Sequence, residues 1–301
     1  MHHARPTTTV RRLLTGLALG AACTLGAIPT ATLAAGYAKG PAPTTASIEA
    51  AGPFATATAK LINNASAYGN GTTVYHPTDK TQGSFGLVVL CPGFVSTAGL
   101  YAGIAERIAS HGFVVAVVQT KSLIDQPKAR ATQMVAVMEA MKAQNKVPSV
   151  AWAGLVDESR VAFMGHSAGG AGTFYAAATH PELKALVGLM AGEPGTSHKA
   201  LAASTTQPTL VLTAENDGLA SSWSEPFFQA LTGTPAPAVW VQLAGANHLS
   251  LWTTASKTSQ ARVAKYALAW AKRFVDEDAR YTPFFQSQGS DLSNFGSKGS
   301  F

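Results

Sequence analysis

The chain has 301 residues, of which 47% are hydrophobic and 13% charged, and its formal net charge is +6. This composition can bury a core and excludes a disordered chain, while the length fits one large domain or two small ones. The basic residues form no run with interleaved aromatic residues, so we expect no nucleic-acid partner.

The first segment, residues 1–35, has the pattern of a secretory signal. Three arginines precede an uncharged apolar stretch over 13–33, and small residues follow as far as Ala35. Glycines, a proline and this small-residue end argue against the alternative, a membrane anchor. We expect cleavage near Ala35 and a secreted protein, extracellular or periplasmic, without stable membrane association after cleavage. Because the three arginines leave with the signal, the remaining chain carries a net charge of +3.

The chain has two cysteines. Cys23 lies within the signal, and Gly20 stands three positions earlier, where lipid attachment would need a large aliphatic residue. Cys91 is then alone in the exported protein, so no intramolecular disulfide can form. It ends the apolar run 87–90, which predicts a buried small hydrophobic residue rather than a reactive thiol.

Apolar strands and helices alternate along the rest of the chain. Residues 36–55 are predicted to be an extended lead-in, and one domain follows over 56–301. Predicted strands cover 72–75, 86–90, 112–118, 185–190, 208–213 and 238–243, and predicted helices cover 100–110, 129–143 and 259–275. Such alternation predicts an α/β fold with a mostly parallel sheet and helices on both faces. The tail over 282–301 is polar with scattered phenylalanines and receives no assignment.

A Gly-His-Ser-Ala-Gly motif at 165–169 separates an apolar run over 160–164 from a run of small residues over 170–174. This is the pattern of a strand, a sharp turn and a helix, with Ser167 at the apex. The two glycines leave room for the strained turn that lifts the hydroxyl out of the sheet. Ser167 is therefore the candidate nucleophile; a simple Gly/Ser loop is the alternative in a chain with 28 glycines.

An acid and a histidine follow Ser167 in the order that an α/β-hydrolase uses. The strand over 209–213 leads to Asp217, and the strand over 239–243 leads to His248. Catalytic groups gather at the carboxyl ends of parallel strands. We therefore predict Asp217 as the orienting acid and His248 as the base.

Other residues compete for these roles. Glu215 lies nearer the strand end than Asp217. His180 closes the helix after the motif, and His198 has no strand before it. His166, beside the nucleophile, is expected to point elsewhere and to pack.

An oxyanion hole needs two backbone N–H groups, one of them from the residue after the nucleophile. That residue is Ala168. The second donor is expected in the loop after an early strand, where Phe94 follows a Pro-Gly pair. We predict Phe94 and Ala168 as the two donors.

The segment between Met190 and Pro208 leaves no room for a helical cap domain, so the cleft should be shallow and open. Such a cleft suits long or insoluble esters, and no buried cation is evident that would favour a free acid. The expected chemistry is attack by Ser167 on an ester, an acyl-enzyme, and its hydrolysis. We expect a monomer that needs no cofactor and no metal.

These residues resemble bacterial cutinases of the actinobacterial type, a family that includes polyester hydrolases active on poly(ethylene terephthalate). The similar segments are 92–94, 107–115, 125–127 with Arg130 and Gln133, 159–167, 214–217, 245–248, 270–276 and 280–282. The resemblance implies an α/β-hydrolase fold, the triad Ser167, Asp217 and His248, and the oxyanion donors Phe94 and Ala168. It also implies that the ring of Phe94 contacts the substrate.

The sequence departs from that family at three points. Ala168 stands where the family usually has Met, the segment 190–195 lacks the family's substrate-clamping Trp, and the C-terminal disulfide is absent. These departures count against aromatic polyesters but leave ester hydrolysis intact. Trp252 is our candidate to replace the lost ring as a substrate-binding residue.

Three alternatives remain at this point. One is another hydrolase on the same scaffold, such as a lipase or other carboxylesterase without polymer activity. The second is a non-catalytic protein, which would be expected to lack a triad member. The third is a metal enzyme, for which the acidic stretch 276–278 is the best candidate; we expect that stretch to be a solvated cluster.

Overall fold

The computed structural model describes residues 1–3, 37–62, 66–193, 195, 198–219, 221–231 and 236–301. The predicted signal over 1–35 lies outside these residues except at its first three positions. The description that follows concerns the unit Ala35–Phe301. Among the described residues, no helix is long and apolar enough to cross a membrane.

The strands and helices of this unit alternate as the sequence predicts. The strands are β1 Thr56–Lys60, β2 Thr73–Pro77, β3 Phe85–Cys91, β4 Phe113–Val117, β5 Val156–His166, β6 Ala185–Leu189, β7 Thr209–Ala214, β8 Ala238–Leu243 and β9 Leu292–Lys298. The helices are α1 Thr45–Glu49, α2 Ala102–Ser110, α3 Pro127–Gln144, α4 Ala168–Ala177, α5 His198–Ala203, α6 Ser221–Ala230 and α7 Lys257–Phe274. Short 3₁₀ helices are η1 Lys80–Gln82, η2 Ala98–Tyr101 and η3 Ala279–Phe285.

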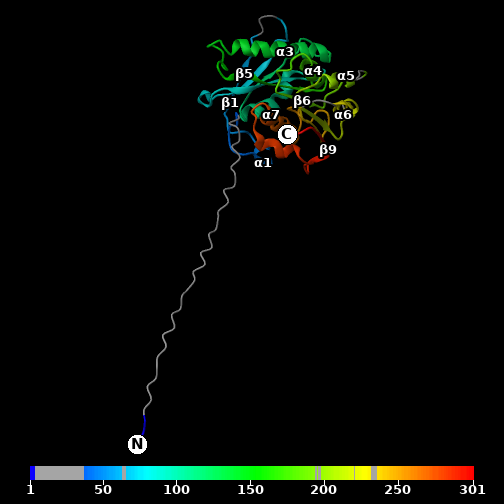
Figure 1. Ribbon diagram of the computed structural model, residues 1–301. Helices are drawn as coiled ribbons and strands as arrows, with labels where there is room; N and C mark the ends of the chain where they lie inside the picture. Colours follow the sequence, from blue (N-terminus) through cyan, green and yellow to red (C-terminus); the bar gives the residue numbers. More distant parts are fainter. Residues whose placement is uncertain (4–36, 63–65, 194, 196–197, 220, 232–235) are drawn as a thin grey trace. The chain divides into compact units, whose positions relative to one another are not determined.

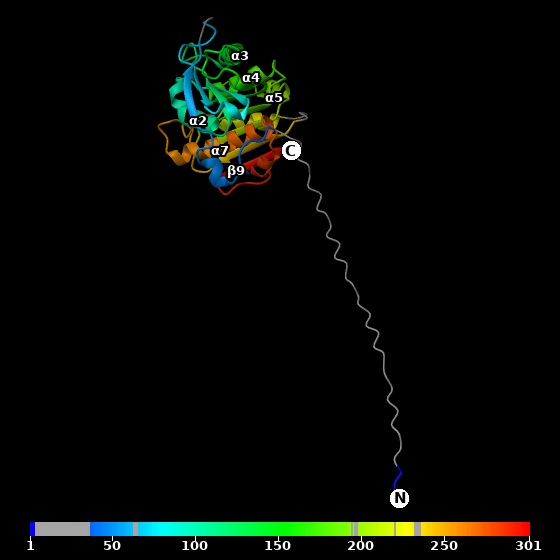
Figure 2. The same ribbon diagram turned by 90° about the vertical axis from the view of Figure 1, so that its left-hand side faces the viewer.

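The described strands form one sheet in the order β1-β2-β4-β3-β5-β6-β7-β8-β9. The strands from β4 to β8 in this order pair in parallel, whereas β2 and β9 run antiparallel to their neighbours. Helices lie on both faces (Figure 1, Figure 2). The predicted α/β fold with a mostly parallel sheet is therefore confirmed. Parallel order brings the carboxyl ends of these strands to one edge of the sheet, where open sheets of this kind bind ligands.

The side chains of β3 show how the sheet separates two cores. Val88 and Leu90 join the cluster beneath α2 and α7, while Leu87, Val89 and Cys91 join the cluster beneath α3, α4 and α6. All of them are fully buried, as expected of a strand covered on both faces. Cys91 is buried, as the sequence predicts, and this burial raises the pKa of its thiol to about 12.

The predicted helix over 129–143 is α3, which begins at Pro127. Proline suits the first turn of a helix because its missing N–H is not needed there. Met134, Met138 and Met141 are fully buried, so the methionine stripe is a core face as predicted. The predicted last helix is α7, and its N-cap Ser256 accepts a hydrogen bond from the backbone N–H of Ser259.

Several elements differ from the sequence-based expectation, which also did not include the helices α5 and α6. The lead-in over 36–55 is not extended throughout, because Thr44 and Ser47 form a capping box that begins α1. The short edge strand β1 was not predicted; its TATAK sequence has no buried face. The unassigned tail contains η3 and the edge strand β9, which pairs with β8 from Ala238 to Leu243.

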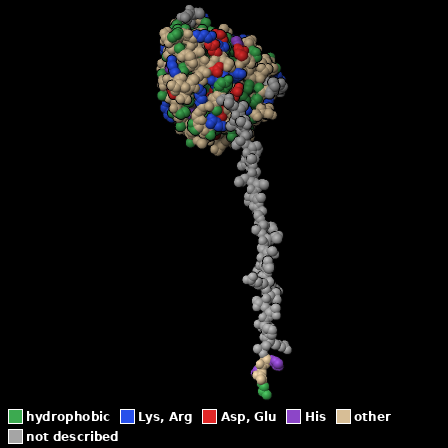
Figure 3. Space-filling view, turned by 60° about the vertical axis from the view of Figure 1, so that its left-hand side comes forward, with side chains coloured by type: hydrophobic (Ala, Val, Ile, Leu, Met, Phe, Trp, Pro, Cys, Tyr) green, Lys and Arg blue, Asp and Glu red, His purple; other side chains and the backbone are tan. Residues whose placement is uncertain are grey.

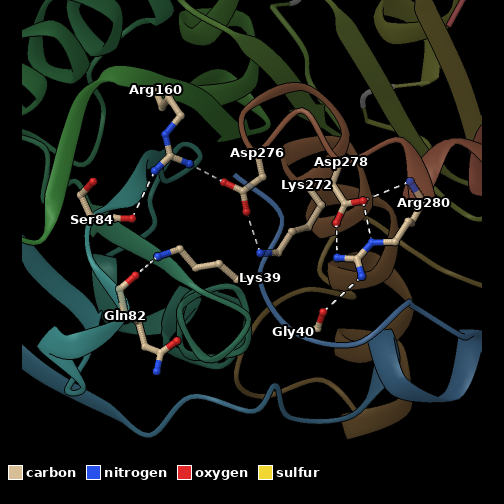
Figure 4. A network of polar contacts seen from close by, with 9 residues as sticks. All are labelled: Lys39, Gly40, Gln82, Ser84, Arg160, Lys272, Asp276, Asp278 and Arg280. Carbon is tan, nitrogen blue, oxygen red and sulfur yellow. Dashed lines mark hydrogen bonds and ion pairs between the residues drawn. The ribbon is translucent and has the colours of Figure 1, made fainter. Parts of the chain in front are cut away.

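The acidic stretch 276–278 is not the solvated cluster that we expected. Asp276 and Asp278 are 1% and 3% exposed. Asp276 binds Arg160 on β5 and Lys272 on α7, each at 2.7 Å, and Asp278 binds Arg280 at 2.7 Å (Figure 4). A buried carboxylate needs cationic partners, and these three basic side chains supply them.

Among the described residues, no group of three or more His, Cys, Asp or Glu side chains could hold a metal ion. On the face drawn in Figure 3, basic and acidic side chains are interspersed.

Candidate active site

Ser167 stands at the sharp turn between β5 and α4, where it is the N-cap of the helix. Its φ of 53° and ψ of −122° are strained values for a residue with a side chain. The motif glycines permit the turn, because a Cβ on Gly165 would meet the backbone of Gly169, and one on Gly169 would meet that of Pro92. Ser167 is partly exposed, while the residues on both sides of it are buried.

Asp217 and His248 meet across the loops that follow β7 and β8. Nδ1 of His248 lies 2.8 Å from Oδ2 of Asp217, and their side chains are 13% and 1% exposed. The other Asp217 oxygen, Oδ1, accepts from the backbone N–H of Leu219 at 2.9 Å. Glu215, the competing carboxylate, instead accepts from the backbone N–H of Gly245 at 2.7 Å. The structure therefore pairs His248 with Asp217.

The His248 ring lies against the residue that precedes Ser167. The centroids of the His166 and His248 rings are 4.6 Å apart. His248 and Asp217 also line a cavity of about 560 Å³, whose other lining residues include Leu219 and Leu249. His180, by contrast, pairs with Glu182 at 2.9 Å, and His198 packs its ring edge-on against Trp223.

The loop after β3 lies directly against the Ser167 turn. A Cβ added to Gly93 would stand 2.9 Å from both Nδ1 of His166 and Cβ of Ser167, so only glycine fits without a shift. Phe94 follows with 46% of its surface exposed. Ala168 is the first residue of α4, in the helical turn whose N–H groups have no intrahelical acceptor.

Arg130 anchors this loop from α3 and is fully buried. Its guanidinium donates to the backbone carbonyls of Pro92 at 3.1 Å, Leu123 at 2.8 Å and Asp125 at 2.7 Å. A buried cation is therefore present, contrary to our expectation from the sequence. Because its three nitrogens all bind backbone oxygens, it is engaged in holding two loops together.

His166 does more than pack. It is 1% exposed, and burial lowers its pKa to about 3, so the ring is neutral near pH 7. Nε2 lies 2.8 Å from the carbonyl oxygen of His248, and Nδ1 lies 2.7 Å from the Tyr101 hydroxyl. No sequence pattern indicates this contact, because Tyr101 lies far upstream in an apolar stretch that predicts a helix.

The two positions considered for an aromatic substrate clamp differ in surroundings. At the end of β6, the Ala191 Cβ packs against Gly170, and the Gly192 N–H donates to the Ser167 carbonyl at 3.1 Å. That segment therefore closes against the turn without an aromatic side chain. Trp252 is partly exposed and sits edge-on to His166, with ring centroids 6.5 Å apart. Its role in substrate binding stays a prediction.

Exposed apolar side chains gather at this edge of the sheet. Among the described residues, ten large apolar side chains are exposed, and six of them lie in the loops that follow β3, β4, β7 and β8. They are Phe94, Val95, Leu123, Ile124, Leu219 and Leu249. Apolar surface concentrated around one site marks a place where an apolar partner binds.

The sheet order, the turn at Ser167 and the acid–histidine pair beyond it define an α/β-hydrolase. A family model described as "PET hydrolase-like" matches residues 31–298 of the chain. The chain belongs to this PET hydrolase-like family.

Curated relatives agree with this assignment. The chain is 38% identical over 251 residues to the bis(hydroxyethyl) terephthalate hydrolase of Streptomyces coelicolor, covering 82% of this chain and 76% of that protein. It is also 38% identical over 254 residues to Cutinase 1 of Thermobifida cellulosilytica, covering 82% of this chain and 90% of the relative. A cutinase of Thermobifida fusca matches at 38% identity over 254 residues, covering 82% of this chain and 78% of the relative.

Proposed function

We propose that this chain is a secreted cutinase-type carboxylic ester hydrolase in which Ser167, His248 and Asp217 form the catalytic triad. The observation that carries the proposal is the 2.8 Å contact between His248 and Asp217, with the His248 ring against His166, the residue before a serine held at a strained φ of 53°. An acid that binds one imidazole nitrogen leaves the other free to take a proton. Residues 1–35 would serve as the signal and leave one catalytic domain.

The proposed reaction runs through an acyl-enzyme. Ser167 Oγ attacks the ester carbonyl while His248 Nε2 takes the hydroxyl proton, and Asp217 stabilises the resulting imidazolium. The N–H groups of Ala168 and Phe94 would bind the oxyanion. His248 then gives its proton to the departing alkoxide, so an alcohol leaves. Water, deprotonated by the same imidazole, attacks the acyl-serine, releases the carboxylic acid and restores Ser167.

The surroundings favour neutral, apolar esters. The exposed apolar loops described above would lie against an aliphatic or aromatic surface, and Arg130 is occupied by backbone carbonyls. Two of the relatives are named cutinases, after a polymeric ester. The third is named for bis(hydroxyethyl) terephthalate, a small ester. We therefore propose polyesters as substrates. A lipase or carboxylesterase without polymer activity is the second candidate, favoured by the missing aromatic residue in the segment 190–195.

Replacement of the serine tests the proposal. Ser167→Ala should abolish hydrolysis of p-nitrophenyl butyrate and labelling by a fluorophosphonate, while the thermal unfolding temperature stays close to that of the wild type. Hydrolysis that survives the substitution would remove Ser167 from the mechanism. Tributyrin, an aliphatic polyester film and an aromatic polyester film, compared with the wild-type enzyme, would then separate the two candidate functions.

A further inference from the structure

The hydrogen bonds around His166 have only one consistent direction. The His248 carbonyl can only accept, so His166 Nε2 must carry the proton and donate to it at 2.8 Å. The ring is neutral, so Nδ1 has a lone pair and accepts the Tyr101 hydroxyl proton at 2.7 Å. The surrounding acceptors thus fix the tautomer of His166.

The Tyr101 hydroxyl oxygen continues the chain toward the loop after β3. It accepts from the backbone N–H of Gly93 at 2.9 Å and from Nε1 of Trp252 at 3.3 Å. Tyr101 is fully buried in η2, so both N–H groups donate to its hydroxyl oxygen without competition from bulk water. One buried chain of hydrogen bonds therefore runs from Gly93 through Tyr101 and His166 to the backbone of His248.

This chain fixes the peptide bond that precedes the second candidate oxyanion donor. The Pro92 carbonyl accepts from Arg130 at 3.1 Å, and the N–H of the same peptide bond, that of Gly93, donates to Tyr101 at 2.9 Å. Both polar ends of the Pro92–Gly93 peptide are thus held by buried side chains. The orientation of this peptide plane sets the direction in which the chain enters Phe94.

We propose that Tyr101 and His166 are positioning residues, which together hold the Phe94 loop and the His248 loop in register with Ser167. The inference rests on the proposed function, since it assigns a purpose to contacts around the proposed triad. Neither side chain is assigned a contact with substrate. Their contribution lies in keeping the proposed oxyanion donor and the proposed base in place relative to the nucleophile.

The predicted effect falls on turnover rather than on substrate binding. Displacement of catalytic groups by about an ångström can lower rates by about 10²-fold, and loss of one oxyanion donor lowers kcat by about 10²- to 10³-fold. Tyr101→Phe keeps the ring but removes the hydroxyl between Gly93 and His166. We expect it to lower kcat for p-nitrophenyl butyrate by about 10- to 100-fold with KM changed less than about threefold.

The matched control is Tyr68→Phe. Tyr68 is also buried, at 4% exposure, and its hydroxyl donates to the backbone carbonyl of Ile62 at 3.0 Å. If a hydroxyl has only a structural role, its removal should lower the thermal stability and leave kcat unchanged. We expect both variants to lose some thermal stability and only Tyr101→Phe to lose kcat.

A second measurement does not depend on turnover. Nitrogen-15 NMR of the histidine side chains in wild-type protein should show His166 with a protonated Nε2, without titration between pH 5 and 9. Tyr101→Phe should alter the Nδ1 signal of this ring, since that atom loses its donor.

The outcomes separate the inference from the proposed function. A wild-type protein that hydrolyses no ester would overturn the proposed function and this inference with it. An active wild-type enzyme whose Tyr101→Phe variant keeps kcat within about twofold would overturn this inference alone. A protonated Nδ1 on His166 in the wild type would do the same, whatever the kinetics.

Discussion

Nη1 of Arg160 lies 2.7 Å from Oδ1 of Asp276, and this contact joins β5, the strand that leads to Ser167, to the end of α7. Both side chains are 2% exposed. Asp276 also binds Lys272, so one carboxylate balances two buried cations (Figure 4). Removal of one member of such a group leaves the others uncompensated.

Asp276→Asn should therefore destabilise the protein by about 3–5 kcal/mol, the cost of breaking a buried ion pair. Denaturant unfolding measures this change. Glu277→Gln is the matched control, because it makes the same chemical change at the neighbouring, exposed residue. Equal losses in the two variants would contradict a specific role for the buried carboxylate.

Asp217→Asn should lower kcat by about 10⁴-fold, since an amide in place of the acid no longer stabilises the charged imidazole. Glu215→Gln should leave kcat within about twofold, because the Glu215 side chain accepts from the backbone N–H of Gly245 rather than from His248. Steady-state hydrolysis of a soluble ester measures both. A larger effect at position 215 than at 217 would reverse the assignment of the acid.

The exposed apolar loops should matter for polymer substrates and not for soluble ones. Ile124 and Leu219 are 62% and 69% exposed at the edge that carries the site. The double variant Ile124→Ser with Leu219→Ser should adsorb less to a polyester film and release less product from it, with unchanged hydrolysis of p-nitrophenyl acetate.

Val147→Ser is the control for these loops, because Val147 is 41% exposed beyond the end of α3, away from the strand ends that carry the site. If this variant lost as much film activity as the double variant, general surface hydrophobicity would explain the effect.

Two histidines make stability depend on pH. Burial lowers the pKa of His166 to about 3 and that of His111 to about 4. The unfolded chain takes up these protons below about pH 6.5, whereas the folded protein does not. The free energy of unfolding should therefore fall as the pH is lowered from about 6.5 to 5, by up to about 1.4 kcal/mol per pH unit for each histidine.

Urea unfolding at several pH values between 7 and 5 checks this dependence. His111→Gln should reduce the slope of the unfolding free energy against pH by the amount that corresponds to one proton, because His166 is then the only one of these two histidines that remains. His111 contacts the Ala50 carbonyl through Nε2 at 3.2 Å, so its replacement should not alter ester hydrolysis. A slope that is the same in both proteins would show that His111 is not buried in its neutral form.

The sheet and the positions of Asp217 and His248 after its strands could be predicted from the sequence because they depend on short-range patterns. Buried parallel strands such as 86–90 are continuous apolar runs, which the sequence shows directly. Two further runs of this kind end near 213 and 243, and the loops that carry Asp217 and His248 begin there. Once β7 and β8 are neighbours in parallel, Asp217 and His248 must emerge at the same edge. Their positions just after two neighbouring parallel strands therefore explain why the two residues lie close together.

The remaining features depend on contacts between distant residues. Tyr101 and His166 are 65 positions apart, and Arg160 and Asp276 are 116 positions apart. A tyrosine in an apolar stretch is predicted as core, and consecutive acids near a helix end are predicted as solvated, unless their partners are known. The strand β9 was missed for the same reason, since LSNFGSK becomes a strand by pairing with β8.

The pairing of β9 with β8 also bears on how the protein would fail. Residues 286–288 before it are exposed, so a protease can reach them. A nick there would free β9 and leave β8 as an unpaired border of the sheet, which invites association with a second molecule. The damaged enzyme would then be lost as an aggregate before any slowing of its chemistry could be measured.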